Sequence, residues 1–304
     1  MTLSDRIRSI VSDANLDAGV AVWHIESGRK LDVNGDAPFP MASTFKIPIL
    51  ATACRQLAAG EISLDERIAL VDDDKSLGSG ILPYFESGLN PTLRDLLTLM
   101  IIISDNTATD IVVDHLGGPA VIEGAMHALG LADIFFKLNC KDLLRHIFPP
   151  EVADLPREDL VKWTSENDIL RDGLAFSKGP ENNVSSANAM NELLHQIFGD
   201  LFPEAIRQVA LNILYKQQFN VRLSRFLPLG TKVAHKTGTI GGIRNDCGII
   251  RISEDSHVIL TLFVEWNEAP YWNLPAAHHQ RVFVVETAMG DIGRAVFDEF
   301  ADTR

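Results

Sequence analysis

A serine and a lysine three residues apart, Ser43 and Lys46, stand in the segment FPMASTFKIPIL at residues 39–50. A serine hydroxyl is a weak nucleophile at neutral pH, and a lysine amine at hydrogen-bond distance could take its proton. The spacing alone does not identify such a pair, because Ser27 and Lys30 share it. The segment SGRK around that second pair is typical of a tight turn between strands, where no helical face holds the two side chains together.

The surroundings of Ser43 and Lys46 predict a helix instead. The stretch STFKIPILATACRQLAAG is rich in Ala and Leu and stops at Gly60, which suits a helix C-cap. Residues three apart on a helix lie on one face within side-chain reach. We therefore expect the two groups to be neighbours at the beginning of a helix. Pro48 removes one backbone donor there and is expected to distort the first turns.

Two further short motifs carry polar groups suited to hydrolytic chemistry. SDN spans residues 104–106 between two predicted helices, and KTG spans residues 236–238 on a predicted strand. Taken alone, the first is typical of a helix-capping loop, and the lysine of the second is typical of a protein surface. Together with Ser43 and Lys46, and in this order along the chain, they form the motif set of class A β-lactamases and penicillin-binding proteins.

The chain resembles a class A β-lactamase along most of its length. LAAGEISLDERI resembles the segment that follows the family's nucleophile helix, and SDNTATDIVVDHLGG resembles the segment around its second motif. The resemblance implies an acyl-enzyme mechanism with Ser43 as nucleophile, Lys46 as acylation base and Ser104 as proton relay towards the leaving nitrogen. Burial and the nearby cation of Lys236 are expected to lower the pKa of Lys46, which would suit a base.

The resemblance also implies which residues bind the substrate. Asn106 would hold both the substrate and the catalytic lysine. Lys236 and Thr237 would offer a cation and a hydroxyl to a substrate carboxylate. Gly238, which has no side chain, would let the substrate approach the strand closely.

Two more features of the site follow from the same resemblance. The backbone N–H groups of Ser43 and Thr239 would stabilise the developing oxyanion, and losing such a donor typically costs about 3–4 kcal/mol of transition-state stabilisation. An arginine binds the substrate carboxylate in some relatives, and Arg222 matches one of its known positions. Arg244 is a second candidate for that role, since forked guanidinium recognition suits carboxylates.

The resemblance fails at the residue that should release the acyl-enzyme. In the family this base is a glutamate with an asparagine four residues later, and residues 131–190 contain no such pair. The region also looks longer than the family's loop, and LPREDLVKW within it predicts a helix opened by Pro156. Glu158, Glu166 or a modified Lys46, as in the class D β-lactamases that share the wording STFKIP, remain alternatives for the missing group.

The remaining pattern predicts an α/β (α+β) fold of the β-lactamase/transpeptidase type. Residues 3–14 predict an amphipathic helix, and strands are predicted in GVAVWHIE, KLDVNG, KVAHKTGT, DCGIIRIS and HVILTLFVEW. We expect an antiparallel sheet built from both termini, flanked by terminal helices, with an all-helical domain inserted. The predicted domains are 1–42 plus 228–304 for the sheet and 43–227 for the helices, with the active site at their interface.

Composition limits the partners. The 304 residues are 46% hydrophobic and 22% charged, with a net charge of −14, which suits a globular protein with a large core. No basic run with interleaved aromatic residues occurs, so neither nucleic acid nor an acidic membrane is an expected partner. Cys54, Cys140 and Cys247 lack metal-like spacing and are predicted to be buried free thiols. We expect no metal and no organic cofactor.

The sequence therefore predicts a serine hydrolase that acts through an acyl-enzyme on Ser43. Its expected substrate is a small molecule with a carboxylate, a β-lactam or a related cyclic amide. Two alternatives stay open: an esterase or amidase of the same fold, and a penicillin-recognising protein that forms a stable acyl-serine without turnover. The N-terminus does not read as a signal peptide, so we expect a cytoplasmic protein if Met1 is native and a periplasmic or secreted one otherwise. The sequence does not predict an oligomeric state.

Overall fold

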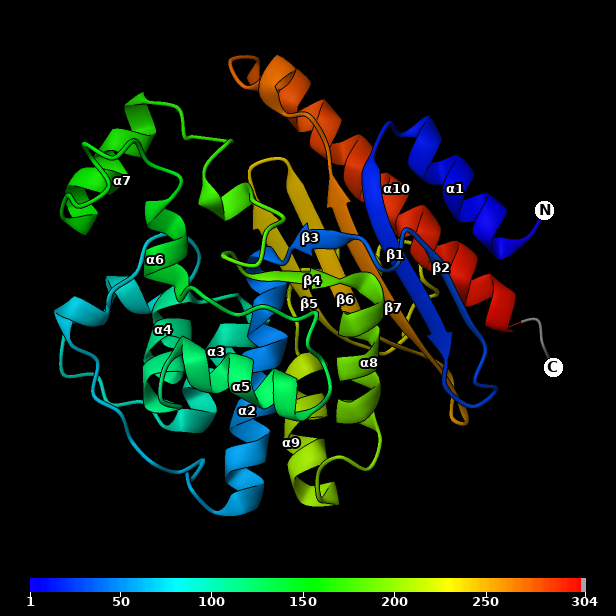
Figure 1. Cartoon of the computed structure of the whole chain (residues 1–304), viewed down its shortest axis with the longest axis horizontal. Helices are drawn as coiled ribbons and strands as arrows, with labels where there is room; N and C mark the ends of the chain where they lie inside the picture. The colour runs from blue at the N-terminus through cyan, green and yellow to red at the C-terminus, as the bar shows by residue number, and fades with distance from the viewer. Residues whose placement is uncertain (302–304) are drawn as a thin grey trace. The chain divides into compact units, whose positions relative to one another are not determined.

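The computed structural model describes residues 1–301, which fall into two compact units (Figure 1). Unit 1 comprises Met1–Thr44, Ser185–Leu201 and the chain from Leu214 onward. Unit 2 comprises Phe45–Val184 and Phe202–Ile213. Each unit is therefore assembled from segments that are far apart in the sequence.

Unit 1 is built on a five-stranded antiparallel sheet with the strand order β2-β1-β7-β6-β5. The central pairing joins the two ends of the chain, because β1 runs opposite β7 with Asp17 facing Glu265 and His24 facing Val258. The prediction of a sheet built from both termini is confirmed. The strands are β1 (Asp17–His24), β2 (Lys30–Val33), β5 (Val233–Ile240), β6 (Ile243–Ser253) and β7 (Ser256–Glu265), and β3 (Pro38–Pro40) pairs separately with β4 (Val184–Ser186).

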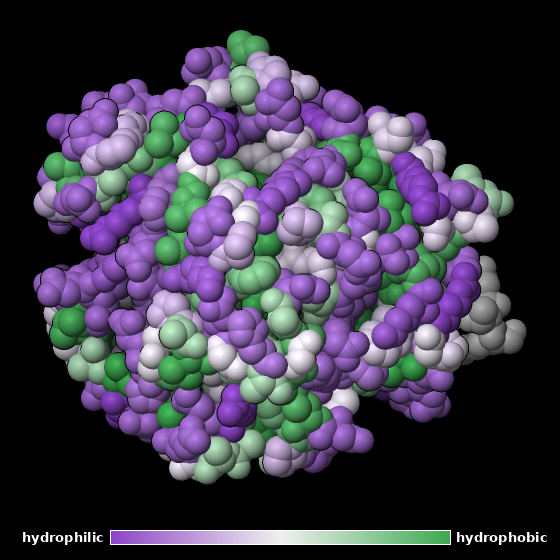
Figure 2. All heavy atoms as spheres, in the orientation of Figure 1, coloured by the Kyte–Doolittle hydropathy of each residue, from purple (hydrophilic) through white to green (hydrophobic). Residues whose placement is uncertain are grey.

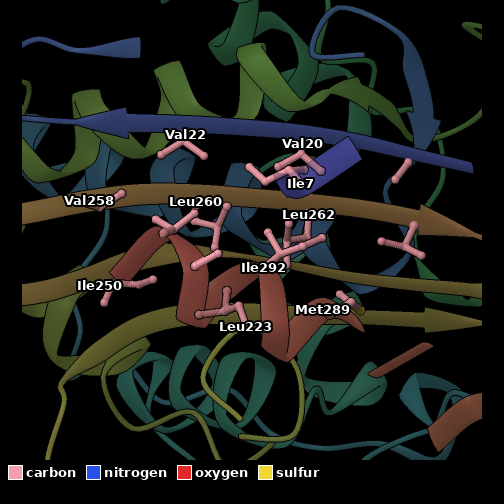
Figure 3. Close-up of a cluster of buried hydrophobic side chains, with 14 of the residues drawn as sticks. Ile7, Val20, Val22, Leu223, Ile250, Val258, Leu260, Leu262, Met289 and Ile292 are labelled. Carbon is pink, nitrogen blue, oxygen red and sulfur yellow. The ribbon is translucent and has the colours of Figure 1, made fainter. Parts of the chain in front are cut away.

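Three helices cover this sheet. α1 (Leu3–Asp13) and α10 (Pro275–Ala301) pack against each other and against the strands, and α8 (Ala187–Phe198) packs on β1 and β7. Figure 3 shows the main core of unit 1, in which side chains from β1 and β7, such as Val20 and Leu262, meet Ile292 of α10. All three are fully buried, and burying a side chain of this size contributes about 1.5–3 kcal/mol.

Unit 2 is helical, and α2 lies at its centre. Every residue of α2 from Lys46 to Cys54 is buried, because its apolar side chains are distributed around the whole helix and pack on α3, α4 and α5. Gly60 ends α2 in a left-handed conformation, φ 71°, as predicted for a C-cap. The helices of unit 2 are α2 (Lys46–Ala59), α3 (Leu93–Ile102), α4 (Asn106–His115), α5 (Pro119–Ala128), α6 (Cys140–Arg145), α7 (Arg157–Glu166) and α9 (Glu204–Leu214).

The two units divide the chain differently from the predicted domains. Residues 43–227 were expected to form one helical domain, yet Ser43, Thr44, Ser185–Leu201 and the chain after Leu214 group with the sheet. The physical reason is visible in α8: it packs on β1 and β7, and His195 stacks on Trp23 with ring centroids 3.8 Å apart. Helical periodicity identifies such a helix but does not say which surface it will cover.

The surface drawn in Figure 2 is mainly hydrophilic. On the face drawn in Figure 2, hydrophilic residues cover most of the area, and hydrophobic residues occur in small scattered groups. In the part of the chain that the structure describes, none of the helices is both long and apolar enough to cross a bilayer.

Candidate active site

Ser43 lies in a short 3₁₀ turn, Ala42–Phe45, that leads directly into α2. It was expected on the helix itself, but the α-helical hydrogen bonding begins only at Lys46. The turn is strained, since Ala42 has φ 43° in the left-handed region. Thr44 stabilises it by donating from Oγ1 to the Met41 carbonyl at 2.7 Å. Ser43 is half-buried at this bend.

Asn245 of β6 fastens this turn to the sheet. Its Nδ2 donates to the carbonyl oxygens of Pro40 and Met41, both at 2.9 Å, and its Oδ1 accepts from the Val264 N–H at 3.1 Å. The side chain is fully buried, so these bonds are shielded from water. Sequence reasoning missed Asn245. The available signal was a polar residue next to the buried strand segment DCGII.

Replacing Asn245 with alanine should therefore weaken both the fold and the site. The Pro40 carbonyl and the Val264 N–H would each lose a buried hydrogen bond, whereas the Met41 carbonyl would keep its bonds from Thr44. Each unsatisfied buried group typically costs about 1–3 kcal/mol. We expect the free energy of unfolding to fall by about 2–4 kcal/mol and acylation of Ser43 to slow, measured by urea titration and by intact-mass kinetics. Asn188→Ala is the matched control, because the Asn188 amide only reaches the exposed Asp36. An equal loss in both variants would contradict the assigned role.

In unit 2, Lys46 is held by both residues of the second motif that sequence reasoning selected. Its Nζ donates to the Ser104 carbonyl at 2.8 Å and to Asn106 Oδ1 at 2.8 Å, and lies 3.0 Å from Ser104 Oγ. A carbonyl and an amide oxygen can only accept, whereas a hydroxyl can also donate. A neutral Lys46 amine can therefore keep two donor bonds while the Ser104 hydroxyl donates to its lone pair.

Ser104 contacts Lys46 from a strained backbone conformation. Ser104 has φ 60°, a left-handed conformation that is uncommon for residues other than glycine. Its carbonyl accepts from both Lys46 Nζ and Ser79 Oγ, the latter at 2.7 Å. Strain of this kind costs about 1–3 kcal/mol and tends to occur at functional sites.

Asp105, the middle residue of the motif, has a structural task. Its carboxylate accepts from the backbone N–H groups of Ile81 and Leu82 at 2.7 and 2.9 Å, and it caps α4 through the Ala108 N–H at 2.9 Å. The helix-capping interpretation therefore holds for Asp105. Its neighbour Asn106 is oriented from both ends, since its Nδ2 donates to the Leu77 carbonyl at 2.7 Å while its Oδ1 accepts from Lys46.

Burial lowers the pKa of Lys46, while the acidic groups of Cys140, Asp110 and Asp105 act in the opposite direction. The side chain is fully buried, so the ammonium form has lost its hydration. Burial was one of the two expected causes.

The third motif lies on β5, at the edge of the five-stranded sheet. An edge strand keeps backbone donors and acceptors available on its outer side, to which an extended ligand can bind. Lys236 and Thr237 are buried, and Lys236 Nζ donates to the Thr237 carbonyl at 2.7 Å. A Cβ at Gly238 would lie 2.8 Å from the Met41 carbonyl and 3.2 Å from Ser43 N. Glycine there lets the turn that carries Ser43 lie against the strand.

Arg222 is buried and makes four hydrogen bonds within unit 1. Nη1 donates to the carbonyls of Gly238 and Asn245 at 2.7 and 2.8 Å, Nη2 donates to Thr239 Oγ1 at 2.6 Å, and Nε reaches Glu286 at 3.3 Å. The guanidinium thus positions the Thr239 hydroxyl at the end of the third motif.

Arg244, the second arginine candidate, also makes contacts within unit 1. Its Nη1 donates to the carbonyls of Gly241 and Ile243, and its guanidinium stacks on the Trp266 ring at 4.9 Å. Burial lowers its pKa to about 10.

A buried pair that sequence reasoning missed supports the same strand. His235 Nδ1 lies 2.8 Å from Asp246 Oδ1, both side chains are fully buried, and Nε2 lies 3.1 Å from Asn220 Oδ1. Asp246 Oδ2 also accepts from the Leu223 N–H at 3.2 Å. The pair therefore ties residues 220–223, which carry Arg222, to β5 and β6.

The carboxylates proposed for deacylation lie on exposed surface. Glu158 and Glu166 are both exposed residues of α7. Closer to Lys46 is Asp110, whose carboxylate is already occupied: it accepts from Ser76 Oγ at 2.6 Å, Cys140 N–H at 2.6 Å and Lys141 N–H at 3.0 Å. Among the described residues, no carboxylate hydrogen-bonds to Lys46, Ser104 or Asn106 side chains.

The candidate residues thus form two groups. Unit 2 brings together Lys46, Ser104 and Asn106, and unit 1 brings the Ser43 turn against the strand that carries Lys236, Thr237, Thr239 and the bonded Arg222. The three cysteines are buried and free, as predicted, and burial raises the pKa of Cys54 to about 12.

Comparison with known proteins shows that this chain resembles beta-lactamases. A family model described as the beta-lactamase enzyme family matches residues 2–300. Beta-lactamase VEB-1 of Pseudomonas aeruginosa is 25% identical over 270 residues, covering 86% of this chain and 82% of the relative. Extended-spectrum beta-lactamase PER-1 of the same organism is 26% identical over 278 residues, covering 86% and 79%.

Solved structures show the same likeness. A beta-lactamase from Sphaerobacter thermophilus is 26% identical with a TM-score of 0.76, over 98% of this chain and 96% of that one. A mutant of PBP-A, solved as an acyl-enzyme complex with penicillin G, is 26% identical with a TM-score of 0.75, over 98% and 96% of the two chains.

Proposed function

Because this chain belongs to the beta-lactamase enzyme family and carries the class A motif set, we propose that it opens β-lactam amide bonds through an acyl-enzyme on Ser43. At the coarser level it is a class A β-lactamase-like hydrolase. The observation that supports the finer proposal best is the buried amine of Lys46, with a lowered pKa, bonded to Ser104 and Asn106.

The proposed reaction uses these groups in sequence. The Lys46 amine takes the hydroxyl proton as Ser43 Oγ attacks the carbonyl carbon, forming the C–O bond of a tetrahedral intermediate. The N–H groups of Ser43 and Thr239 stabilise its oxyanion. The amide C–N bond then breaks, and the proton returns through Ser104 to the leaving nitrogen.

We propose that Lys236 and Thr237 bind the substrate carboxylate, as the motif implies. For Arg222 we propose an indirect role. Its donors are already bonded to Gly238, Asn245, Thr239 and Glu286, so it would act by holding Thr239 rather than by meeting the substrate itself.

Deacylation is proposed to be the slow step. Water must be activated to cleave the acyl-serine ester, and the two loop glutamates lie exposed on α7 while Asp110 already accepts three hydrogen bonds. A modified Lys46 fits poorly, because a carbamate would direct negative oxygens at the Ser104 carbonyl and Asn106 Oδ1. These contacts favour the stable acyl-serine as the second candidate function.

The test is a stopped-flow assay with a chromogenic cephalosporin beside intact-protein mass spectrometry. We expect a burst of about one chromophore per enzyme followed by turnover at least about tenfold slower, with the acyl adduct as the dominant species during that phase. Linear turnover without a burst would contradict slow deacylation but leave β-lactam hydrolysis intact. The absence of both burst and adduct would contradict the proposed substrate and favour the esterase or amidase alternative.

A further inference from the structure

A cationic cavity lies in unit 2, formed by the loop before α3, α6, α7 and the segment between them. Its volume is about 120 Å³, and four of its ten lining residues are basic: Lys75, Lys141, Arg145 and Arg157. None of these ten described residues is acidic, although acidic residues outnumber basic ones 41 to 27 in the whole chain. The cavity therefore has a charge opposite to that of the protein.

Two of the four cations have carboxylate partners at the surface. Lys75 pairs with Asp72 at 2.7 Å, and Arg145 pairs loosely with Asp142 and Asp154 at 3.5 and 3.9 Å. The side chains of Asp72 and Asp154 are 77% and 91% exposed, so these pairs point outward and are weak. These surface ion pairs do not explain why four basic side chains line one cavity.

The other two cations have no carboxylate partner among the described residues. Lys141 Nζ donates to the Asp73 backbone carbonyl, and Arg157 Nε donates to the Ser76 carbonyl at 3.3 Å. The Arg157 guanidinium also lies over the Tyr84 ring, 5.7 Å from its centroid. Asp114 interacts electrostatically with Lys141 but forms no ion pair with it, so neutral carbonyls and a ring are the direct contacts of the two cations. Such contacts leave both side chains able to bind an anion.

The rest of the lining is mainly apolar. Five apolar side chains, including Leu144 and Leu160, contribute to it beside the single hydroxyl residue Ser76. A cavity of about 150 Å³ admits benzene, which has six non-hydrogen atoms, so 120 Å³ suits a molecule of about five or six. The lining thus combines cations with a hydrocarbon surface, which fits an anion that has a short apolar tail.

We propose that this cavity is a binding site for a short-chain carboxylate, separate from the catalytic groups on Ser43 and Lys46. The carboxylate lies between Lys141 and Arg157, and the hydrocarbon tail lies against the leucine side chains. The cavity wall includes Leu77, whose carbonyl accepts from Asn106 Nδ2 at 2.7 Å, so the ligand lies behind the loop that orients the catalytic amide.

The experiment is isothermal titration of the intact protein with butanoate, which has six non-hydrogen atoms. Butanamide is the neutral counterpart of the same shape. Acetate lacks most of the hydrocarbon tail and shows how much the tail contributes to binding. Inorganic phosphate shows whether negative charge alone is enough for binding. We expect butanoate to bind at least about tenfold more tightly than each of the three, and its binding to weaken as salt is raised. Ser43→Ala should bind butanoate like the wild type, because the catalytic serine takes no part.

Variants locate the site. Lys141→Gln and Arg157→Gln should each weaken butanoate binding by at least about fivefold, whereas Lys162→Gln should not, because Lys162 lies on α7 outside the lining. Equal affinity for butanoate and butanamide, tight phosphate binding, no binding at all, or unchanged butanoate affinity in both Lys141→Gln and Arg157→Gln would each overturn the proposal. The comparison of the four ligands on the wild type needs no variant, so it stands even if a substituted chain fails to fold.

Discussion

Replacing Ser43 with alanine is expected to abolish both β-lactam turnover and the acyl adduct, lowering turnover by at least about 10⁴-fold. The reason is chemical: without Oγ no ester can form, and the neighbouring groups have nothing to activate. The strained turn should persist, because its hydrogen bonds come from Thr44 and Asn245 rather than from the Ser43 side chain. The measurement is steady-state hydrolysis of a chromogenic cephalosporin together with intact-protein mass.

The chain supplies a matched control for that substitution. Ser27 has a lysine at the same spacing, Lys30, but its hydroxyl lies in an exposed turn 2.7 Å from His24 Nδ1. Ser27→Ala should retain wild-type turnover and the full mass adduct. If Ser43→Ala kept the adduct, the nucleophile would be another residue and the proposed mechanism would be wrong.

Replacing Lys46 with glutamine is expected to slow acylation by about 10²–10⁴-fold, the usual contribution of a positioned base. In the wild type the rate of acylation should rise with pH, because only the neutral amine can take the Ser43 proton. Burial lowers the pKa of Lys46, so the midpoint of this rise should lie below the ordinary lysine pKa of 10.5. In Lys46→Gln this pH-dependent rise should disappear.

The pH profile of the burst rate separates a base from a structural role. A residue that only supports the site would lower the rate by the same factor at every pH. Lys30→Gln is the control, since the exposed Lys30 is not part of the network around Ser104 and Asn106. An unchanged pH profile in Lys46→Gln, even with a lower rate, would assign the base to another group.

Much of the candidate site was predictable because its members lie within short motifs. Ser43 and Lys46, the SDN loop and the KTG strand each depend on local spacing and on the helix or strand that carries them, and local pattern encodes both. The sheet built from both termini followed from the order of the strands. The absence of the loop glutamate could likewise be recognised from the sequence. The structure adds that Glu158 and Glu166 lie exposed on α7.

Tertiary structure alone decided how these groups are supported. Asn245 bonds to a carbonyl 205 residues away, and Arg222 donates to two strand carbonyls and to Thr239. Such bonds depend on strand register and on which helix packs where, and no local pattern specifies either. The cationic cavity has the same origin, because Lys75, Lys141 and Arg157 come from separate segments. Sequence determined which chemical groups the protein has, and long-range packing determined which of them meet.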